Sequence, residues 1–371
     1  MKIKTLLTGL FIQTSLFLFS QTTVVDSIVS GGIYRSYRVY IPAAYTGSTA
    51  RPLVFDLHGY TSNASSEQFY SNFMPIADTA NFLVVYPQGT NLNGQPYWNA
   101  GFGPGVNDIQ FISELIDTLK NTYTIDPNSI YSCGMSNGGF MSQTLACELN
   151  NKIAAIASVT GSMTTLQYST CNPARPVPMM QVSGNADGTV PYAGSSTAIH
   201  IDTLVRYWVL KNNCNLTPQF NNVPNTNMLD GCTAEHYVYS GGIAGASCEL
   251  YKIIGGGHTW PGSPYTIGTT NQDFSASLKI WLFFRKYKLN QFVGIQEVKN
   301  NENYTIYPNP CTNTLTVDNK AVISITIKDL TGKVVIETST KQIDVSALAK
   351  GIYSVELYTY NYMTIKKLVK L

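Results

Sequence analysis

The sequence predicts a doubly wound, mostly parallel α/β sheet followed by a small all-β domain. Through the first three quarters of the chain, short apolar runs alternate with amphipathic helical segments, a pattern typical of parallel strands with helices on both faces. After about Leu289 the helical periodicity stops, and short strands and turns continue to the end. We therefore expect two domains, at 22–289 and 304–371, joined by a polar linker at 290–303.

The spacing of apolar residues defines the expected elements of the first domain. Alternating residues around Gly31 and Gly32 predict a β-hairpin, short continuous apolar runs predict buried strands, and apolar residues three or four apart predict helices. The expected strands are 24–29, 33–41, 53–57, 82–86, 130–133, 153–159, 177–182, 237–240 and 248–254, and the expected helices are 69–80, 109–123, 137–149, 196–210 and 274–287. Residues 88–107, rich in Gly, Asn and Pro, predict a long loop, and such loops are usually functional.

The C-terminal segment predicts a small β-sandwich. Its strands are short, and Gly and Pro residues separate them. The expected strands are 315–317, 323–330, 334–337, 351–358 and 363–369.

Composition and the N-terminus limit the possible function and location. The 371 residues carry a net charge of +2, so nothing indicates a nucleic-acid partner. Lys2 and Lys4 precede an apolar run from Leu6 to Phe19, which predicts a signal peptide at 1–21. The run is short and interrupted by polar residues, and no later run approaches membrane-spanning length, so we expect no transmembrane segment in the mature chain.

The seven cysteines suit an exported protein with disulfides. We favour bridges between Cys147 and Cys171 and between Cys214 and Cys248, with Cys232 as an alternative partner for either of the last two. No C-x-x-C or histidine-rich spacing is present, so we expect neither a metal site nor a cofactor.

The chain is organised around Gly134-Met135-Ser136-Asn137-Gly138, a G-x-S-x-G sequence between an expected strand and an expected helix. At such a junction a strained turn lifts the serine hydroxyl above the sheet edge, and the small flanking residues allow the close backbone crossing. This context favours a nucleophile at Ser136 over a chance match.

A nucleophilic serine needs a base, and the chain has four histidines. His258 follows three glycines after a late strand, so its loop can reach the serine at the top of the sheet. His58 comes too early in the chain for the usual order, His200 falls in an expected helix, and His236 lies in an edge-like region. We therefore predict His258 as the base.

The carboxylate that orients this base is predicted at Asp187. It follows the strand after the nucleophile unit, at the carboxyl end of the sheet where ligand groups gather. Asp202, Asp230 and Asp273 are alternatives, although Asp202 falls in an expected helix and Asp273 suits a helix cap. A simple turn aspartate is the other interpretation of Asp187.

The remaining predicted site residues are expected to stabilise the oxyanion or line the substrate pocket. Backbone N–H groups of Asn137 and of Tyr60, in the loop after the 53–57 strand, are predicted to stabilise the oxyanion. Trp98 and Trp260 are predicted to wall the substrate pocket, with core packing as the alternative for both.

Residues 50–287 contain, in this order along the chain, the motifs LVFDLHGY, YWNAGFG, VND, GMSNGG, NADGTVPY and GGGHTWPG. In these motifs the segment resembles the polyhydroxybutyrate depolymerase-like and feruloyl-esterase-like α/β-hydrolases of carbohydrate esterase family 1. The resemblance implies an α/β-hydrolase fold and serine-dependent hydrolysis of carboxylic esters, with Ser136, Asp187 and His258 on the motif positions. Many relatives have Cys where this chain has Tyr60, a difference that affects the shape of the pocket more than the backbone donor.

Residues 304–371 are similar to type IX secretion sorting domains of Bacteroidota in YPNP, DLTGK, LAKGIY and the basic-apolar end KKLVKL. This similarity implies recognition by the type IX secretion machinery and release from the cell or attachment to its surface.

The leading hypothesis is a secreted serine ester hydrolase acting on feruloyl or acetyl esters of plant cell-wall polysaccharide. A depolymerase of polyhydroxybutyrate or another polyester is the nearest alternative, because the chemistry is the same. A serine peptidase and a non-catalytic surface protein are weaker alternatives: no propeller or lid domain accompanies the fold, and the Ser, Asp and His positions are complete.

Overall fold

The computed structural model describes residues 21–102, 105–292, 305–318, 322, 324–330, 333–358 and 363–371. The predicted signal peptide at 1–21, except for its last residue, lies outside the described residues, as does most of the predicted linker at 290–303.

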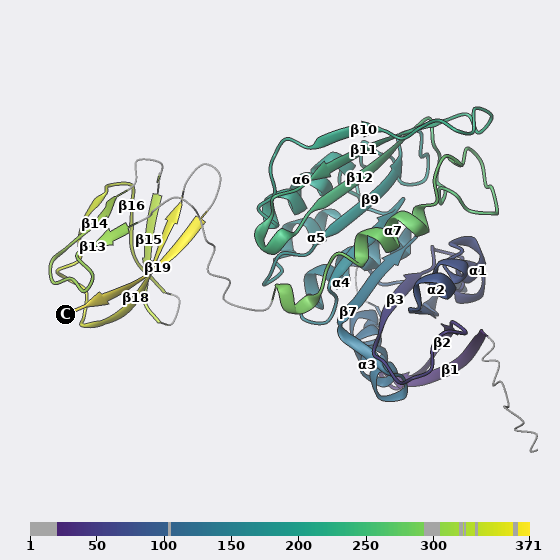
Figure 1. Cartoon of the computed structure of the whole chain (residues 1–371), viewed down its shortest axis with the longest axis horizontal. Helices are drawn as coiled ribbons and strands as arrows, with labels where there is room; N and C mark the ends of the chain where they lie inside the picture. The colour runs from purple at the N-terminus through teal and green to yellow at the C-terminus, as the bar shows by residue number, and fades with distance from the viewer. Residues whose placement is uncertain are drawn as a thin grey trace, which may run out of the picture.

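The N-terminal domain is built on one ten-stranded sheet, in the order β1-β2-β4-β3-β7-β8-β9-β12-β11-β10 (Figure 1). The six central strands, from β4 to β12, are parallel, and antiparallel strands extend the sheet at both ends. The strands are β1 (Thr22–Ser30), β2 (Ile33–Ile41), β3 (Arg51–Leu57), β4 (Leu83–Pro87), β7 (Ile125–Gly134), β8 (Ala155–Val159), β9 (Met179–Gly184), β10 (Gln219–Asn222), β11 (Thr233–Tyr239) and β12 (Cys248–Ile254).

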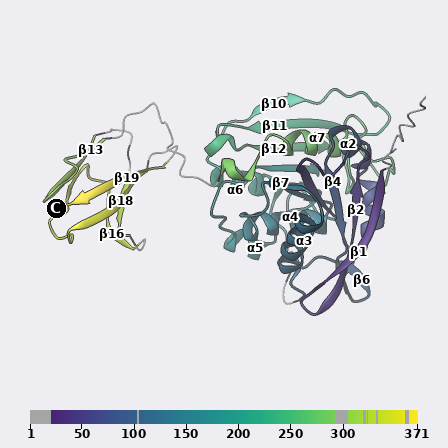
Figure 2. The ribbon, with the colours of Figure 1, turned by 60° about the horizontal axis from the view of Figure 1, so that its bottom comes forward.

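Helices cover both faces of this sheet, and each face has its own apolar core (Figure 2). Helices α3 (Asp108–Thr122), α4 (Asn137–Glu148) and α6 (Ile201–Lys211) pack on one face, near the short α5 (Thr165–Thr170). Helices α1 (Ala64–Tyr70), α2 (Met74–Ala80) and α7 (Ala276–Phe284) lie on the other. The central strands are therefore covered on both sides, which is why they are continuous apolar runs.

The structure confirms the predicted α/β class and corrects several elements. The helix expected at 69–80 is two helices, because Asn72 between them has a positive φ of 56° and Pro75 starts the second. The long loop at 88–107 contains a small hairpin, β5 (Thr90–Leu92) and β6 (Gln95–Tyr97). Strand β10 and helix α5 were not predicted, and α6 begins at Ile201 instead of 196.

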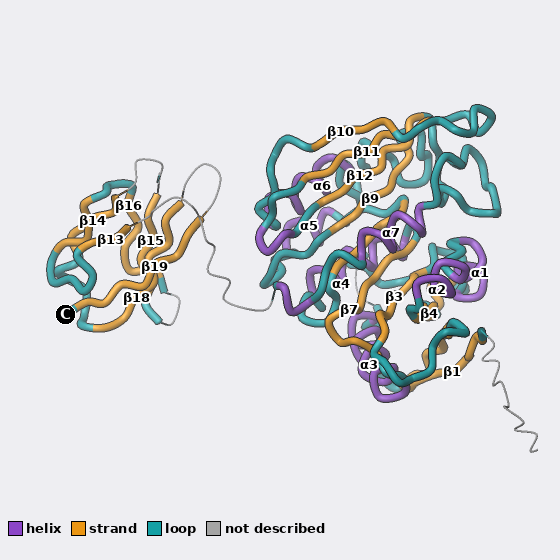
Figure 3. The backbone as a smooth tube through the Cα atoms, viewed as in Figure 1, coloured by secondary structure: helices purple, strands orange, loops and turns teal. Residues whose placement is uncertain are grey.

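The described part of the C-terminal segment folds into two antiparallel sheets, as expected for a small β domain (Figure 3). One sheet has the order β13-β14-β17 and the other β16-β15-β18-β19. A separate apolar cluster that includes Leu315, Ile325 and Val355 forms its core. The strands are β13 (Thr305–Tyr307), β14 (Thr314–Asp318), β15 (Ser324–Lys328), β16 (Val334–Thr338), β17 (Gln342–Asp344), β18 (Gly351–Tyr358) and β19 (Met363–Lys370).

One predicted disulfide is formed. Cys147 at the end of α4 is bonded to Cys171 after α5. Cys214 and Cys248, the second predicted pair, are free buried thiols in the structure, and each is the hydrogen-bonding neighbour of the other.

Candidate active site

The turn between β7 and α4 has the geometry of a nucleophile elbow. Ser136 has φ 52° and ψ −116°, an unfavourable conformation for a residue with a side chain. Its N–H donates to the carbonyl of Val159 in β8 at 2.8 Å, which holds the turn against the neighbouring strand. A Cβ atom at Gly138 would overlap the carbonyl oxygen of Leu57, so a larger residue cannot occupy this crossing.

Asp187 and His258 meet at the same edge of the sheet. They come from the loops after β9 and β12, which are adjacent parallel strands. His258 Nδ1 lies 2.7 Å from Asp187 Oδ2, and because a carboxylate can only accept, Nδ1–H is the donor. Asp187 Oδ1 accepts the N–H groups of Thr189 and Val190, each at 2.8 Å. The carboxylate is thus fixed, and His258 Nε2 remains available.

Backbone bonds between these two loops explain how the pair is positioned. The N–H of Asn185 donates to Ile253 at 2.9 Å, and that of Ala186 donates to Gly256 at 3.1 Å. The side chain of Asn185 in turn accepts the N–H of Gly255 at 2.7 Å. The glycines that precede His258 therefore pack directly on the Asp187 loop.

The alternative acids are engaged elsewhere. Asp202 accepts from Tyr192 OH at 2.5 Å, Asp230 accepts the N–H of Gln272 at 2.7 Å, and Asp273 accepts that of Thr226 at 2.7 Å. Among the described residues, none of these three bonds to His258.

The other histidines have structural partners. His58 is buried, its Nε2 accepts the N–H of Gly89 at 3.0 Å, and burial lowers its pKa to about 4, so it stays neutral. His200 caps α6, and His236 contacts Glu249 at 2.9 Å. Ser136 and His258 lie at the same edge, but the described residues include no hydrogen bond between them.

The N–H groups predicted for the oxyanion belong to Tyr60 and Asn137. Asn137 is the first residue of α4, where a backbone N–H has no partner within the helix. Tyr60 follows β3, the strand next to β7, and its N–H donates to no group within the described residues. Both donors are therefore free to bind a ligand oxygen.

The prediction that Trp98 and Trp260 wall the pocket is wrong. Both side chains are 0% exposed and cannot touch a substrate. Trp98 Nε1 donates to the carbonyl of His58 at 3.0 Å, and Asn137 binds both backbone groups of Trp98, at 2.6 and 3.0 Å. Trp260 donates to Ser277 Oγ at 3.0 Å beneath α7. Trp98 and Trp260 therefore pack beneath the loops of the site and support them.

Most of the residues that line the cavity at Ser136 were not predicted from the sequence; Tyr60, Ser136 and Asn137 are the exceptions. The cavity encloses about 370 Å³, and its walls come from four separate segments. Phe102 and Phe140 form an aromatic pair in it, with centroids 5.3 Å apart. The lining residues are Tyr60, Leu92, Tyr97, Phe102, Ser136, Asn137, Phe140, Thr189, Val190, Ser195, Thr197 and Ala198. The only signal in the sequence was the long loop predicted at 88–107, which supplies Leu92, Tyr97 and Phe102.

The described part of the chain contains neither a membrane-spanning helix nor a cluster of metal-ligating side chains. No helix in it is long and apolar enough to cross a bilayer. No group of three or more His, Cys, Asp or Glu side chains in it could hold a metal ion.

Comparison with known proteins identifies relatives of both domains. Residues 305–371 match the secretion system C-terminal sorting domain. A bifunctional acetylxylan esterase/xylanase of Neocallimastix patriciarum is 31% identical over 46% of this chain and 24% of its own length. Feruloyl esterase B of Piromyces equi is 28% identical over 60% of this chain and 40% of its own. Poly(3-hydroxyalkanoate) depolymerase C of Paucimonas lemoignei is 28% identical over 66% of this chain and 63% of its own length.

The chain thus spans less than two thirds of the length of these three relatives. Among solved structures, an acetyl xylan esterase from Aspergillus awamori superposes with a TM-score of 0.50 at 14% identity, over 64% of this chain and 94% of that one. The chain therefore has an α/β-hydrolase fold, its relatives are acetylxylan and feruloyl esterases and polyhydroxyalkanoate depolymerases, and it ends in a secretion sorting domain.

Proposed function

We propose that this chain is an exported serine ester hydrolase that acts on aromatic acyl esters of plant cell-wall polysaccharide. The observation that carries the proposal is the 2.7 Å bond between His258 and Asp187, at the same sheet edge as the strained Ser136 turn. The names of the acetylxylan and feruloyl esterase relatives support the same chemistry.

In this mechanism Ser136 Oγ attacks the ester carbonyl while His258 Nε2 takes its proton. Asp187 keeps the imidazole in the tautomer with Nδ1 protonated and stabilises the imidazolium that forms. The free N–H groups of Tyr60 and Asn137 bind the oxyanion of the tetrahedral intermediate. Catalytic hydrogen bonds often close only when substrate is bound, so the Ser136–His258 bond is expected to form in the complex.

The cavity favours an aromatic acyl group over acetyl. A volume of about 370 Å³ lies within the range of small-molecule sites, and an acetyl group alone would leave most of it empty. The Phe102–Phe140 pair offers apolar surface to a planar ring, while Thr189, Ser195 and Thr197 place hydroxyl groups in the same lining. A hydroxylated aromatic acid such as ferulate matches both properties.

Substitution tests the mechanism. Ser136→Ala should lower kcat/KM on methyl ferulate by at least about 10³-fold and abolish labelling by a fluorophosphonate probe. Ser195→Ala is the matched control, because it removes a hydroxyl from the same cavity and should keep the label. His258→Ala should behave like Ser136→Ala, and Asp187→Asn should retain more activity. Full activity of Asp187→Asn would refute the assignment of the acid.

The substrate is tested by comparing methyl ferulate, acetylated xylan and polyhydroxybutyrate film. Turnover of methyl ferulate well above the other two supports the proposal. Clearing of the film without ferulate release would favour the second candidate, a polyester depolymerase, which the similarity to the depolymerase of Paucimonas lemoignei supports.

We also propose that the chain is organised as a signal peptide at 1–21, a catalytic domain at 22–289, a linker at 290–303 and a sorting domain at 304–371. The sorting-domain match supports export by type IX secretion machinery of the Bacteroidota kind, with release or surface attachment. Deletion of 304–371 should leave hydrolysis intact and retain the protein inside the producing cell. Normal export of the truncated chain would refute this role.

A further inference from the structure

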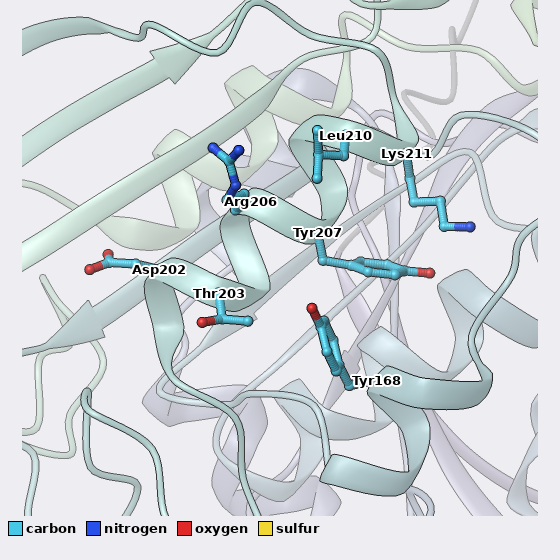
Figure 4. A pocket seen from close by; sticks show the side chains of 7 residues that line it. All are labelled: Tyr168, Asp202, Thr203, Arg206, Tyr207, Leu210 and Lys211. Carbon is cyan, nitrogen blue, oxygen red and sulfur yellow. The ribbon is translucent and has the colours of Figure 1, made fainter. Parts of the chain in front are cut away.

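A second hollow lies outside the Ser136 cavity, between α5 and α6 (Figure 4). It encloses about 440 Å³ and shares no lining residue with the cavity at Ser136. Tyr168 comes from α5, and six residues of α6 complete the lining: Asp202, Thr203, Arg206, Tyr207, Leu210 and Lys211.

Two tyrosine rings form a fixed aromatic surface in this hollow. Tyr168 and Tyr207 point toward one another, with centroids 5.7 Å apart and an edge-on angle of 63°. The hydroxyl of Tyr207 donates to the carbonyl of Cys171 at 2.8 Å, and Cys171 is bonded to Cys147. Tyr168 is 39% exposed, and Leu210 beside them is 55% exposed. The ring of Tyr207 is thus held by a hydrogen bond, and the Tyr168 ring packs edge-on against it while apolar surface faces solvent.

Positive charge lies beside this surface. Arg206 is exposed and makes no ion pair or side-chain hydrogen bond with any described residue. Lys211, five residues further along α6, donates to Asn172 at 2.7 Å and lies 5.8 Å from the centre of the Tyr207 ring. Asp202, one turn before Arg206 on α6, accepts from Tyr192 OH. The guanidinium of Arg206 is therefore the group free to bind a planar anion such as a carboxylate.

We propose that this hollow is a secondary binding site for a pyranose polysaccharide that carries carboxylate groups. The apolar face of a sugar ring packs on the exposed ring of Tyr168, and a uronic acid carboxylate pairs with Arg206. The inference rests on the proposed function for the polymeric nature of the substrate.

The position of the hollow suits this role. Ala198 lines the Ser136 cavity, and α6 starts three residues later at Ile201, so one segment connects the two sites. A helix rises about 1.5 Å per residue, which places Tyr207 about 9 Å along the axis from Ile201. A polysaccharide held here keeps its esters close to the catalytic edge.

Binding is tested separately from hydrolysis. The full chain with Ser136→Ala is run in affinity electrophoresis against glucuronoxylan and against the same polymer after carboxyl reduction. Adding Arg206→Glu should weaken binding of glucuronoxylan by about tenfold and leave binding of the reduced polymer unchanged, whereas Tyr168→Ala should weaken both. Arg285→Glu is the matched control, because it makes the same charge change directly after α7, on the opposite face of the sheet.

The binding results with these variants support or overturn the proposed site. Unchanged binding in both Arg206→Glu and Tyr168→Ala, equal loss in Arg285→Glu, or no binding by the parent would overturn the site. Methyl ferulate turnover and the thermal midpoint, measured with Ser136 intact, should be unaltered by Arg206→Glu. Absent turnover together with the expected binding pattern would defeat the proposed function and leave the binding site standing.

Discussion

A buried carboxyl pair beneath the catalytic edge should make the stability of this protein depend on pH. Asp56 in β3 is 0% exposed and lies two residues before His58. Burial raises the pKa of Asp56 to about 7, and hydrogen bonds involving Ser71 and Cys133 offset only part of that rise. Burial and the neighbouring Asp56 charge also raise the pKa of Glu67 well above its ordinary value. Both groups are thus held neutral in weakly acidic solution.

The direction and size of this pH dependence follow from the raised pKa of Asp56. Because the folded pKa of Asp56 lies above its ordinary value of 3.8, the folded state binds more protons than the unfolded chain between about pH 4 and pH 7. The contribution of Asp56 to the free energy of unfolding therefore falls as pH rises through this window and levels off above it. At about 1.4 kcal/mol for each pKa unit, the loss is on the order of 4 kcal/mol.

Asp56→Asn replaces the acid by a neutral group of the same shape. The variant and the parent should be similarly stable near pH 4, and at pH 8 the variant should be the more stable one, as measured by urea unfolding followed by tryptophan fluorescence. Glu148→Gln, at the exposed last residue of α4, is the control and should leave the pH profile unchanged. If Asp56→Asn keeps the parent's pH slope, or is the less stable protein at pH 8, the reasoning is refuted.

Three further predictions concern the scaffold. Gly138→Ala should push a methyl group into the Leu57 carbonyl and cost more than about 4 kcal/mol, seen as a large drop in thermal midpoint or loss of soluble protein. Cys171→Ser opens a bridge with a sequence separation of 24 and should cost about 3 kcal/mol; a midpoint equal to that of the parent without reductant would contradict this. Cys214 and Cys248 are free buried thiols, so alkylation of the unfolded protein without reductant, followed by peptide mapping, should recover them separately alkylated; a linked pair would contradict the structure.

Much of the fold was predictable because its signals are local. The G-x-S-x-G turn and the central strands are defined by short runs of residues, and the structure has strands at each predicted position in the first domain. The chain order Ser136, Asp187, His258 also led to the carboxylate that His258 contacts, since loops after parallel strands meet at one edge. The catalytic roles of these three residues stay a prediction.

What could not be predicted depends on contacts between distant segments. Trp98 and Trp260 are equally compatible with a pocket wall and with a core, and only the packed structure shows them buried. The aromatic pair of the cavity joins Phe102 in a loop to Phe140 in α4, and no periodicity relates the two. The break between α1 and α2 depends on the backbone of Asn72, which a helical pattern of apolar residues conceals.

The bonds from Asn137 to Trp98 divide the long loop into a fixed part and an exchangeable part. The side chain of Asn137 accepts the N–H of Trp98 and donates to its carbonyl, and Asp108 Oδ2 accepts the N–H of Asn99 at 2.7 Å. Substitution of Phe102 would change the surface that faces the acyl group, while the serine turn stays in register. Acyl selectivity can therefore diversify at a position just beyond the anchored segment, without rebuilding the strand-turn-helix that presents the nucleophile.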